Sequence, residues 1–254
     1  MPDHKIVSRE QWLTARKALL AMEKEATHQR DRVNAARLAL PWVKVDKDYQ
    51  FDTPEGRKSL GELFDGRSQL IVYHFMLGPG WKEGCRGCSF VSDHVAGSLP
   101  HLAARDVAYV AVSRAPLAKL EEFKERMSWN FAWVSSNSTD FNYDYNVSFT
   151  KDQVDNGTTG YNFGTQRFPE VEGPGASCFI KDEDGNIFHT YSSFGRGLDG
   201  MINAYNWLDI APKGRDESNM MPPMAWVRHH DKYPQSNPSA AAAKDTGCCH
   251  HENK

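Results

Sequence analysis

The sequence predicts an α/β domain with a mixed central sheet, an N-terminal helical extension and a C-terminal tail. Two apolar runs, residues 70–77 and 107–112, are typical of strands buried on both faces of a sheet. Helical signals separate these runs, and such alternation favours an α/β sheet. Two further apolar runs, residues 176–181 and 187–191, flank a turn rich in Asp, Asn and Gly, which predicts an antiparallel hairpin.

Length and composition set the outer limits of this architecture. The chain has 254 residues, of which 40% are hydrophobic and 25% charged, so a globular domain with appendages can form. We expect the helical extension over residues 1–40 and the domain over residues 41–212. Prolines and an alanine run predict a partly disordered tail over residues 213–254.

Charge and hydropathy argue against two classes of partner. The 30 basic residues nearly balance the 33 acidic ones, and this net charge of −3 argues against nucleic acid. No apolar run approaches the roughly 18 residues of a membrane span. Residues 1–5 lack the apolar core of a signal peptide. The expected compartment is therefore the cytoplasm, where thiols stay reduced.

The extension opens with a helix start signal. Ser8 and Gln11 form a capping box, in which the two side chains satisfy free backbone amides. Apolar residues then recur at three- and four-residue steps as one stripe: Trp12, Ala15, Leu19, Met22 and Ala26. Pro41 ends the helix. We interpret its basic residues as the solvated face of a helix that packs against the domain, with an anionic-ligand site as the alternative.

The elements of the domain follow one another in a specific order. They are a strand at 70–77, a helix at 85–105, a strand at 107–112, a helix at 116–127, a strand at 131–135, the hairpin strands and a helix at 198–207. Residues 136–170 are expected to be irregular. A βαβ half followed by a ββα half is the thioredoxin topology, here with one additional strand. The sequence therefore predicts a thioredoxin-like fold.

A Cys-x-x-Cys pair, Cys85 and Cys88, lies between the first buried strand and the helix after it. The first cysteine falls at the helix start, where free amides and the helix dipole favour a thiolate. Lys82 and Arg86 add positive charge, so we expect a lowered pKa at Cys85. The second cysteine follows one turn later and can attack a mixed disulfide formed on the first. We therefore predict a redox pair with Cys85 as nucleophile and Cys88 as resolving residue.

A zinc site and inert thiols are the other interpretations of this pair. A structural zinc site normally needs four ligands. The further candidates are Cys178, in a predicted strand, and the C-terminal run Cys248-Cys249-His250-His251. We interpret that run as the polar end of the tail, with adventitious metal binding as the alternative. Neither a metal nor a cofactor is expected.

Three more residues are candidates for supporting roles. Asp93, five residues after Cys88, is either a proton acceptor at the helix flank or a structural hydrogen-bonding residue. His74, in the first buried strand, fits a core histidine better than a catalytic one. Trp81 either walls the site or belongs to the core.

With these residues the sequence resembles the bacterial and fungal thioredoxin-like family of formerly unknown function. Its members are described as predicted dithiol-disulfide oxidoreductases related to alkyl hydroperoxide reductases. The matching stretches span most of residues 8–212 and are 40–43, 73–76, 84–90 with Asp93, 140–142, 189–191 and 196–199. The resemblance implies a thioredoxin fold with Cys85 and Cys88 as the redox pair, and it specifies the fold better than the substrate.

The sequence departs from thioredoxins around the pair. Thioredoxins usually have Trp before the first cysteine, where this chain has Gly84. They have Gly-Pro between the cysteines, where this chain has Arg86 and Gly87. An arginine beside the thiol favours the thiolate and predicts a more oxidising couple. Pro174 has about the spacing of the thioredoxin cis-proline, and both isomers remain open.

The lead hypothesis is a cytoplasmic thiol–disulfide oxidoreductase. Its substrate is a protein or small-molecule disulfide or thiol, and an external dithiol recycles it. A peroxiredoxin-like thiol peroxidase is one alternative, weakened because Lys82 and Gly78 stand where typical peroxiredoxins have Thr and Pro. A non-enzymatic thioredoxin-fold binding protein is the other. The aromatic-rich segment 137–167 either covers the cysteine site or forms a packing or dimer surface, so a homodimer stays open.

Overall fold

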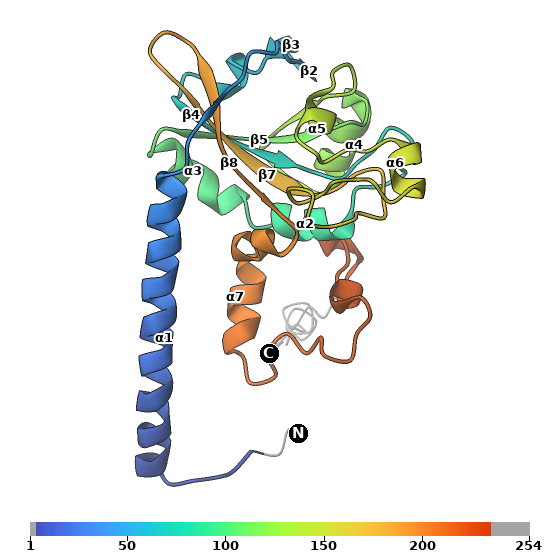
Figure 1. Cartoon of the computed structure of the whole chain (residues 1–254). Coiled ribbons are helices and arrows are strands. Elements are labelled where there is room, and N and C mark those ends of the chain that lie inside the picture. Colours follow the sequence, from blue (N-terminus) through green and yellow to red (C-terminus); the bar gives the residue numbers. More distant parts are fainter. Residues whose placement is uncertain (1–3, 235–254) are drawn as a thin grey trace, which may run out of the picture.

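The computed structural model describes residues 4–234 and has an eight-stranded mixed sheet at its centre (Figure 1). The strand order is β1-β8-β7-β4-β5-β6-β2-β3. The strands are β1 (Val43–Lys44), β2 (Gln50–Thr53), β3 (Gly56–Ser59), β4 (Gln69–His74), β5 (Val107–Ser113), β6 (Ala132–Ser135), β7 (Gly175–Lys181) and β8 (Ile187–Phe194). The α-helices are α1 (Arg9–Leu38), α2 (Arg86–Ser92), α3 (Leu99–Ala103), α4 (Leu117–Arg126), α5 (Phe141–Asp144), α6 (Lys151–Asp155) and α7 (Asn203–Ile210). The 3-10 helices are η1 (Glu62–Phe64), η2 (Ala96–Ser98), η3 (Gly195–Met201), η4 (Pro223–Trp226) and η5 (His230–Lys232).

Four strands form the predicted thioredoxin-like core. β4 pairs in parallel with β5 and antiparallel with β7, and β7 pairs antiparallel with β8. The βαβ half and the ββα half therefore meet along β4, and the predicted fold is confirmed. The additional strand, β6, adds to this core in parallel with β5. The β2–β3 hairpin extends the sheet on that side.

β4 is buried on both faces, as its apolar run predicts. On one face Tyr73 and Phe75 pack with Cys88 in the largest buried cluster, which also holds side chains of α4. On the other face Leu70 and Val72 belong to a second buried cluster. Burying side chains of this size stabilises a fold by about 1.5–3 kcal/mol each. The helix α2, which carries Cys88, is therefore held by buried side chains against one face of β4.

Two helices differ from their predicted bounds. The helix expected over 85–105 is interrupted, because η2 follows α2 and a separate helix, α3, begins at Leu99 with Pro100 in its first turn. Proline suits the first turn of a helix, whereas inside one its ring clashes with the preceding turn. The last helix begins at Asn203, since residues 195–201 with their glycines form η3 instead.

The extension forms α1, with the capping box of Ser8 and Gln11 in place. The expectation that this helix packs against the domain is wrong: none of its residues is buried, and it projects beyond the sheet (Figure 1). Near its C-terminal end the guanidinium carbon of Arg37 lies 4.6 Å from the ring centroid of Tyr191 on β8. Neither α1 nor any other helix of the described chain is long and apolar enough to cross a membrane.

Residues 213–234, here called the C-terminal segment, pack against the domain despite their irregular backbone. Val227 and His229 keep only 1% and 2% of their surface exposed. In Figure 1 the segment lies below α2, on the side away from the sheet. The predictions of disorder after Pro234 and of a polar run at 248–251 lie outside the described residues.

Candidate active site

The end of β4 and the chain after it position the cysteine pair. The chain stays extended to Leu77, whose carbonyl accepts a hydrogen bond from the N–H of Ala115 at 2.9 Å. It then turns back, and the N–H of Cys85 donates to the carbonyl of Met76 at 3.0 Å. α2 begins directly afterwards, with Cys85 as its N-cap residue. The pair therefore lies between a buried strand and a helix start, where the sequence places it.

Gly84 permits the close approach of this turn to the core. A Cβ atom at this position would lie 2.7 Å from the ring of Phe75 and 2.9 Å from the ring of Phe123. The departure from thioredoxins at this position thus has a packing reason, because no larger residue fits without moving two buried rings. The Gly84 carbonyl accepts a hydrogen bond from Nε2 of His229 at 2.9 Å. The C-terminal segment therefore contacts the residue directly before Cys85.

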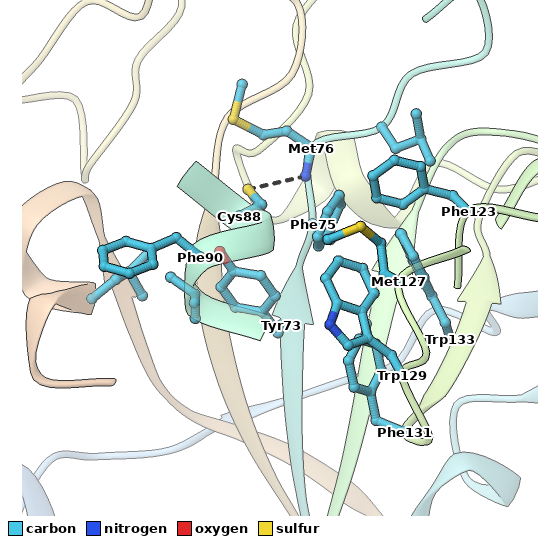
Figure 2. Close-up of a cluster of buried hydrophobic side chains, with 14 of the residues drawn as sticks. Tyr73, Phe75, Met76, Cys88, Phe90, Phe123, Met127, Trp129, Phe131 and Trp133 are labelled. Atoms are coloured by element: carbon cyan, nitrogen blue, oxygen red, sulfur yellow. Dashed lines mark hydrogen bonds between the residues drawn. The ribbon is translucent and has the colours of Figure 1, made fainter. Parts of the chain in front are cut away.

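The two cysteines have opposite surroundings. Cys85 is half-buried, whereas Cys88 is buried and its Sγ accepts a hydrogen bond from the N–H of Met76 at 3.4 Å (Figure 2). The Cys88 side chain hydrogen-bonds the Cys85 sulfur, and this contact lowers the Cys85 pKa most. Burial opposes it, but the amides of Cys88 and Gly87 and the charge of Arg86 bring that pKa to about 6. Burial raises the pKa of Cys88 well above its usual value. At neutral pH the pair is thus one thiolate and one thiol.

Arg86 and Lys82, both expected to act on Cys85, behave differently. Arg86 is the first residue of α2, and its charge is one of the causes of the low Cys85 pKa. Lys82 is exposed, and its side chain forms no ion pair or hydrogen bond with the part of the chain that the structure describes.

Asp93 and Trp81 have structural contacts. Asp93 Oδ1 accepts hydrogen bonds from Nε1 of Trp129 at 2.8 Å and from Nδ1 of His230 at 2.7 Å. Of the two roles expected for Asp93, these contacts favour the structural one, which fastens the end of α2. Trp81 is half-buried against the same core cluster as Cys85, and its carbonyl accepts a hydrogen bond from Lys119.

His74 lies on the other side of the sheet from the pair. Its neighbour Tyr73 packs with Cys88, whereas the His74 ring packs against Phe141, with ring centroids 5.7 Å apart. Its Nε2 hydrogen-bonds to the hydroxyl of Ser177 at 2.8 Å. Burial lowers the His74 pKa to about 3, so the ring stays neutral. The structure therefore places His74 in the core, the role that the sequence favours.

Pro174 directly precedes β7. The first residue of that strand, Gly175, pairs with the last residue of β4. Pro174 therefore lies near the end of β4 from which the chain continues to the cysteines. The peptide bond before Pro174 is trans. The Pro174 carbonyl accepts a hydrogen bond from the hydroxyl of Tyr161 at 2.6 Å.

The aromatic-rich segment 137–167 packs as a small core of its own. Phe149 and Tyr161 form a buried cluster with Phe194 of β8, and Phe141 belongs to the core on the His74 side of the sheet. Of the roles expected for this segment, the structure supports packing.

Cys85 lines a cavity of about 1050 Å³. Four parts of the chain form its walls: Cys85, Arg86 and Gly87 at the start of α2; Arg196 and Asp199 of η3; Tyr205 and Asp209 of α7; and Arg215, Glu217, Met224 and Val227 of the C-terminal segment. Phe168 completes the lining on the side of the aromatic-rich segment. Sequence reasoning singled out two of the distant residues, Arg196 and Asp199, through the resemblance alone. The other distant residues carry no motif or periodicity that reveals them.

Ion pairs hold the C-terminal segment against the cysteine loop. Arg126 of α4 pairs with Asp231 at 2.8 Å and with Glu83 at 2.9 Å. Lys232 pairs with Glu83 at 2.6 Å. Because Glu83 lies two residues before Cys85, these contacts connect the C-terminal segment to the loop that leads to Cys85.

Within residues 4–234, no group of three or more His, Cys, Asp or Glu side chains is arranged to hold a metal ion. Cys178 lies on β7, and burial raises its pKa to about 11.

The chain is similar to several solved structures at low sequence identity. One is peroxidoxin BcpB from Mycobacterium tuberculosis, with 12% identity, a TM-score of 0.42, and 65% of this chain and 93% of that chain covered. Another is PrxQ from Xylella fastidiosa, with 13% identity, a TM-score of 0.39, and 63% and 88% covered. A third is a yeast mitochondrial 1-Cys peroxiredoxin, with 16% identity, a TM-score of 0.40, and 68% and 78% covered. No curated protein matches. A family model described as "Bacterial protein of unknown function (DUF899)" matches residues 1–233.

Proposed function

We propose that this chain, which belongs to the bacterial protein family DUF899, is a thiol–disulfide oxidoreductase with Cys85 as nucleophile and Cys88 as resolving residue. The asymmetry of the pair carries the proposal. The half-buried cysteine that lines the cavity has the low pKa, and the buried cysteine has the raised one. Thiol–disulfide exchange needs two cysteines with different pKa values. The thiolate attacks the substrate first, and the second cysteine stays protonated until the mixed disulfide has formed.

The proposed reaction proceeds in two exchange steps. The Cys85 thiolate attacks one sulfur of a substrate disulfide, forms a mixed disulfide and releases the other sulfur as a thiolate. The Cys88 thiol then gives up its proton, attacks Sγ of Cys85 and releases the second substrate thiol. The substrate disulfide is reduced, the Cys85–Cys88 disulfide forms, and an external dithiol reduces it again.

The first test is the pH dependence of Cys85 alkylation by iodoacetamide. Because the thiolate reacts, the rate should rise through a midpoint of about 6 in the wild-type chain. Cys88→Ala should move this midpoint upward, since the contact that lowers the Cys85 pKa most is lost. Cys178→Ser is the matched control and should leave the midpoint unchanged. A wild-type midpoint near the ordinary thiol value of about 8.5 would contradict the proposal.

The second test traps the intermediate. Cys88→Ser should accumulate a mixed disulfide at Cys85, detected by mass spectrometry, because the resolving thiol is absent. Cys85→Ser should form none. Consumption of hydrogen peroxide with dithiothreitol, run in parallel, examines the peroxidase alternative. Rapid peroxide consumption without disulfide exchange would replace the proposed activity by that alternative.

A further inference from the structure

We propose that the cavity beside Cys85 binds a small disulfide that carries carboxylate groups, and that Arg86 and Arg196 recognise its charge. This inference rests on the proposed function, because it names the substrate class of the same site.

The construction of the cavity suits a small molecule. Its volume of about 1050 Å³ is at the upper end of small-molecule sites. Phe168, Met224 and Val227 provide apolar walls against which methylene groups can pack. Two of these three belong to the C-terminal segment, which the Arg126–Asp231 pair fastens at 2.8 Å. A folded protein would have to displace this segment to reach Cys85 through the cavity, whereas a small disulfide would not.

The charges that line the cavity leave one arginine uncompensated beside the thiol. Arg215 is fully engaged, because it binds both oxygens of Asp209 at 2.7 and 2.8 Å and Asp199 at 3.1 Å. Arg86, in contrast, has no carboxylate within 4.0 Å among the described residues. Its guanidinium reaches only the carbonyl of Val227, at 3.4 Å. Arg86 therefore has donors available for an anion next to Cys85.

A second arginine is weakly held. The side chain of Arg196 is 90% exposed, and its contacts with Asp199 measure 3.4 and 3.5 Å. The remaining acidic residue, Glu217, accepts hydrogen bonds from the hydroxyl of Tyr205 at 3.0 Å and from the indole of Trp226. Both bonds end on Oε1 of Glu217, and neither donor is one of the arginines of the cavity. A guanidinium binds a carboxylate through two parallel hydrogen bonds, which gives direction as well as charge.

These contacts would hold the substrate for the exchange step. Binding of a carboxylate places the disulfide over Cys85, whose thiolate attacks the nearer sulfur. The S–S bond breaks, one carboxylate-bearing thiolate leaves and takes up a proton, and the other half stays on Cys85. Attack by Cys88 releases that half as a thiol and forms the protein disulfide, which an external dithiol reduces.

Three disulfides of matched length test the charge preference: 3,3′-dithiodipropionate, 2-hydroxyethyl disulfide and cystamine. They carry carboxylate, hydroxyl and ammonium groups, each separated from sulfur by two methylene groups. The measurement is the second-order rate constant for oxidation of the reduced chain by each. Their intrinsic reactivities differ, so the diagnostic quantity is the carboxylate-to-ammonium rate ratio in a variant relative to the wild-type chain. This ratio also cancels any uniform loss of reactivity when the Cys85 pKa changes.

Arg86→Gln should lower that ratio about fivefold, as expected for a partly screened ion pair. Arg196→Gln should lower it less, and the double variant should lower it most. Arg57→Gln, on the distant β3, is the matched control and should leave it unchanged. An unchanged ratio in the double variant would overturn the inference. So would faster reduction of insulin, a protein disulfide, than of all three small disulfides.

A binding measurement separates this inference from the proposed function. Octanedioate, the carbon analogue of dithiodipropionate, should protect Cys85 from iodoacetamide in the wild-type chain and should protect it less in Arg86→Gln. 1,6-Diaminohexane should not protect. If octanedioate protects but none of the disulfides reacts, the proposed function fails and the anion site stands. If all three disulfides react and octanedioate does not protect, the proposed function stands and this inference fails.

Discussion

The two ends of the described chain differ in an instructive way. α1 is a regular helix of 30 residues with a complete capping box, and none of its residues is buried. The C-terminal segment has almost no regular structure, yet Val227 and His229 are among the most buried residues of the molecule. Local signals in the sequence specify the first, while contacts with distant residues hold the second. A segment can therefore have regular secondary structure without packing into the core, and the reverse. The cysteine site depends on the irregular C-terminal segment.

The largest effect should follow from removing the C-terminal segment. A chain that ends at residue 212 should lose at least about 3 kcal/mol of unfolding free energy, because Val227 and its half-buried neighbours Met224 and Trp226 leave the core. Urea unfolding measures this loss. A chain that ends at residue 234 keeps the segment and should match the full chain. Equal stability of the two shortened chains would show that the buried contacts contribute little.

A smaller effect should follow from cutting one anchor of the segment. Arg126→Gln loses pairs with Asp231 and Glu83, and we expect a loss of about 1 kcal/mol, reduced at high salt because the groups are partly exposed. Arg32→Gln on α1 removes a comparable surface pair with Glu25 and should change stability by less than half of this. If the two substitutions had the same effect, the contrast between the chain ends would not extend to their ion pairs.

Acid should loosen the C-terminal segment before it affects α1. The pKa of Asp231 is lowered mainly by its hydrogen bonds with Arg126, and that of Glu83 mainly by its hydrogen bonds with Lys232. A depressed pKa in the folded state means that the contribution is present at neutral pH and is lost as pH falls below about 4. Hydrogen exchange by mass spectrometry, with rates corrected for the slower intrinsic exchange in acid, should show reduced protection of residues 223–233 at low pH. Unchanged protection of these residues while the core melts would contradict the expectation.

The smallest effect should follow from deleting α1. A chain that begins at residue 39 loses the Arg37–Tyr191 contact and no buried side chain, so its unfolding free energy should fall by less than about 1 kcal/mol. Alkylation of Cys85 should keep its pH midpoint. A large loss of stability would mean that α1 is covered in solution by something that the single chain does not show, and size-exclusion chromatography would then report a larger assembly.

Local patterns account for what the sequence predicts well. The apolar runs locate β4 and β5, the Asp-Gly-Asn turn locates the β7–β8 hairpin, and the N-cap residue Ser8 locates the start of α1. The position of the cysteine pair follows from this order. Helix bounds near Pro100 and η3 are less predictable, because a proline or glycine inside a helical pattern can end it or be tolerated.

Long-range contacts account for what the sequence does not predict. Arg126 and Asp231 are 105 residues apart along the chain, and neither belongs to a motif. His229 bonds the Gly84 carbonyl from a segment that reads as a tail. The position of Asp93 after the cysteines makes it a candidate, yet its hydrogen bonds with Trp129 and His230 depend on residues 36 and 137 positions away along the chain. Most of the residues that line the cavity likewise lie far from the cysteines along the chain and belong to no motif.

The low pKa of Cys85 links the redox chemistry proposed for the pair to the thermal unfolding of the whole molecule. In the reduced chain the folded state holds a thiolate that the unfolded chain lacks between pH of about 6 and about 8.5, so folding gains free energy as pH rises through this window. The disulfide form holds no thiolate and gains nothing from this source. By the same thermodynamic cycle, a contact that stabilises the reduced fold more than the disulfide form would make the proposed couple a stronger oxidant. Each contact that stabilises the thiolate, including those of Arg86 and the Cys88 thiol, therefore affects both the reduction potential of the pair and the unfolding temperature of the reduced chain.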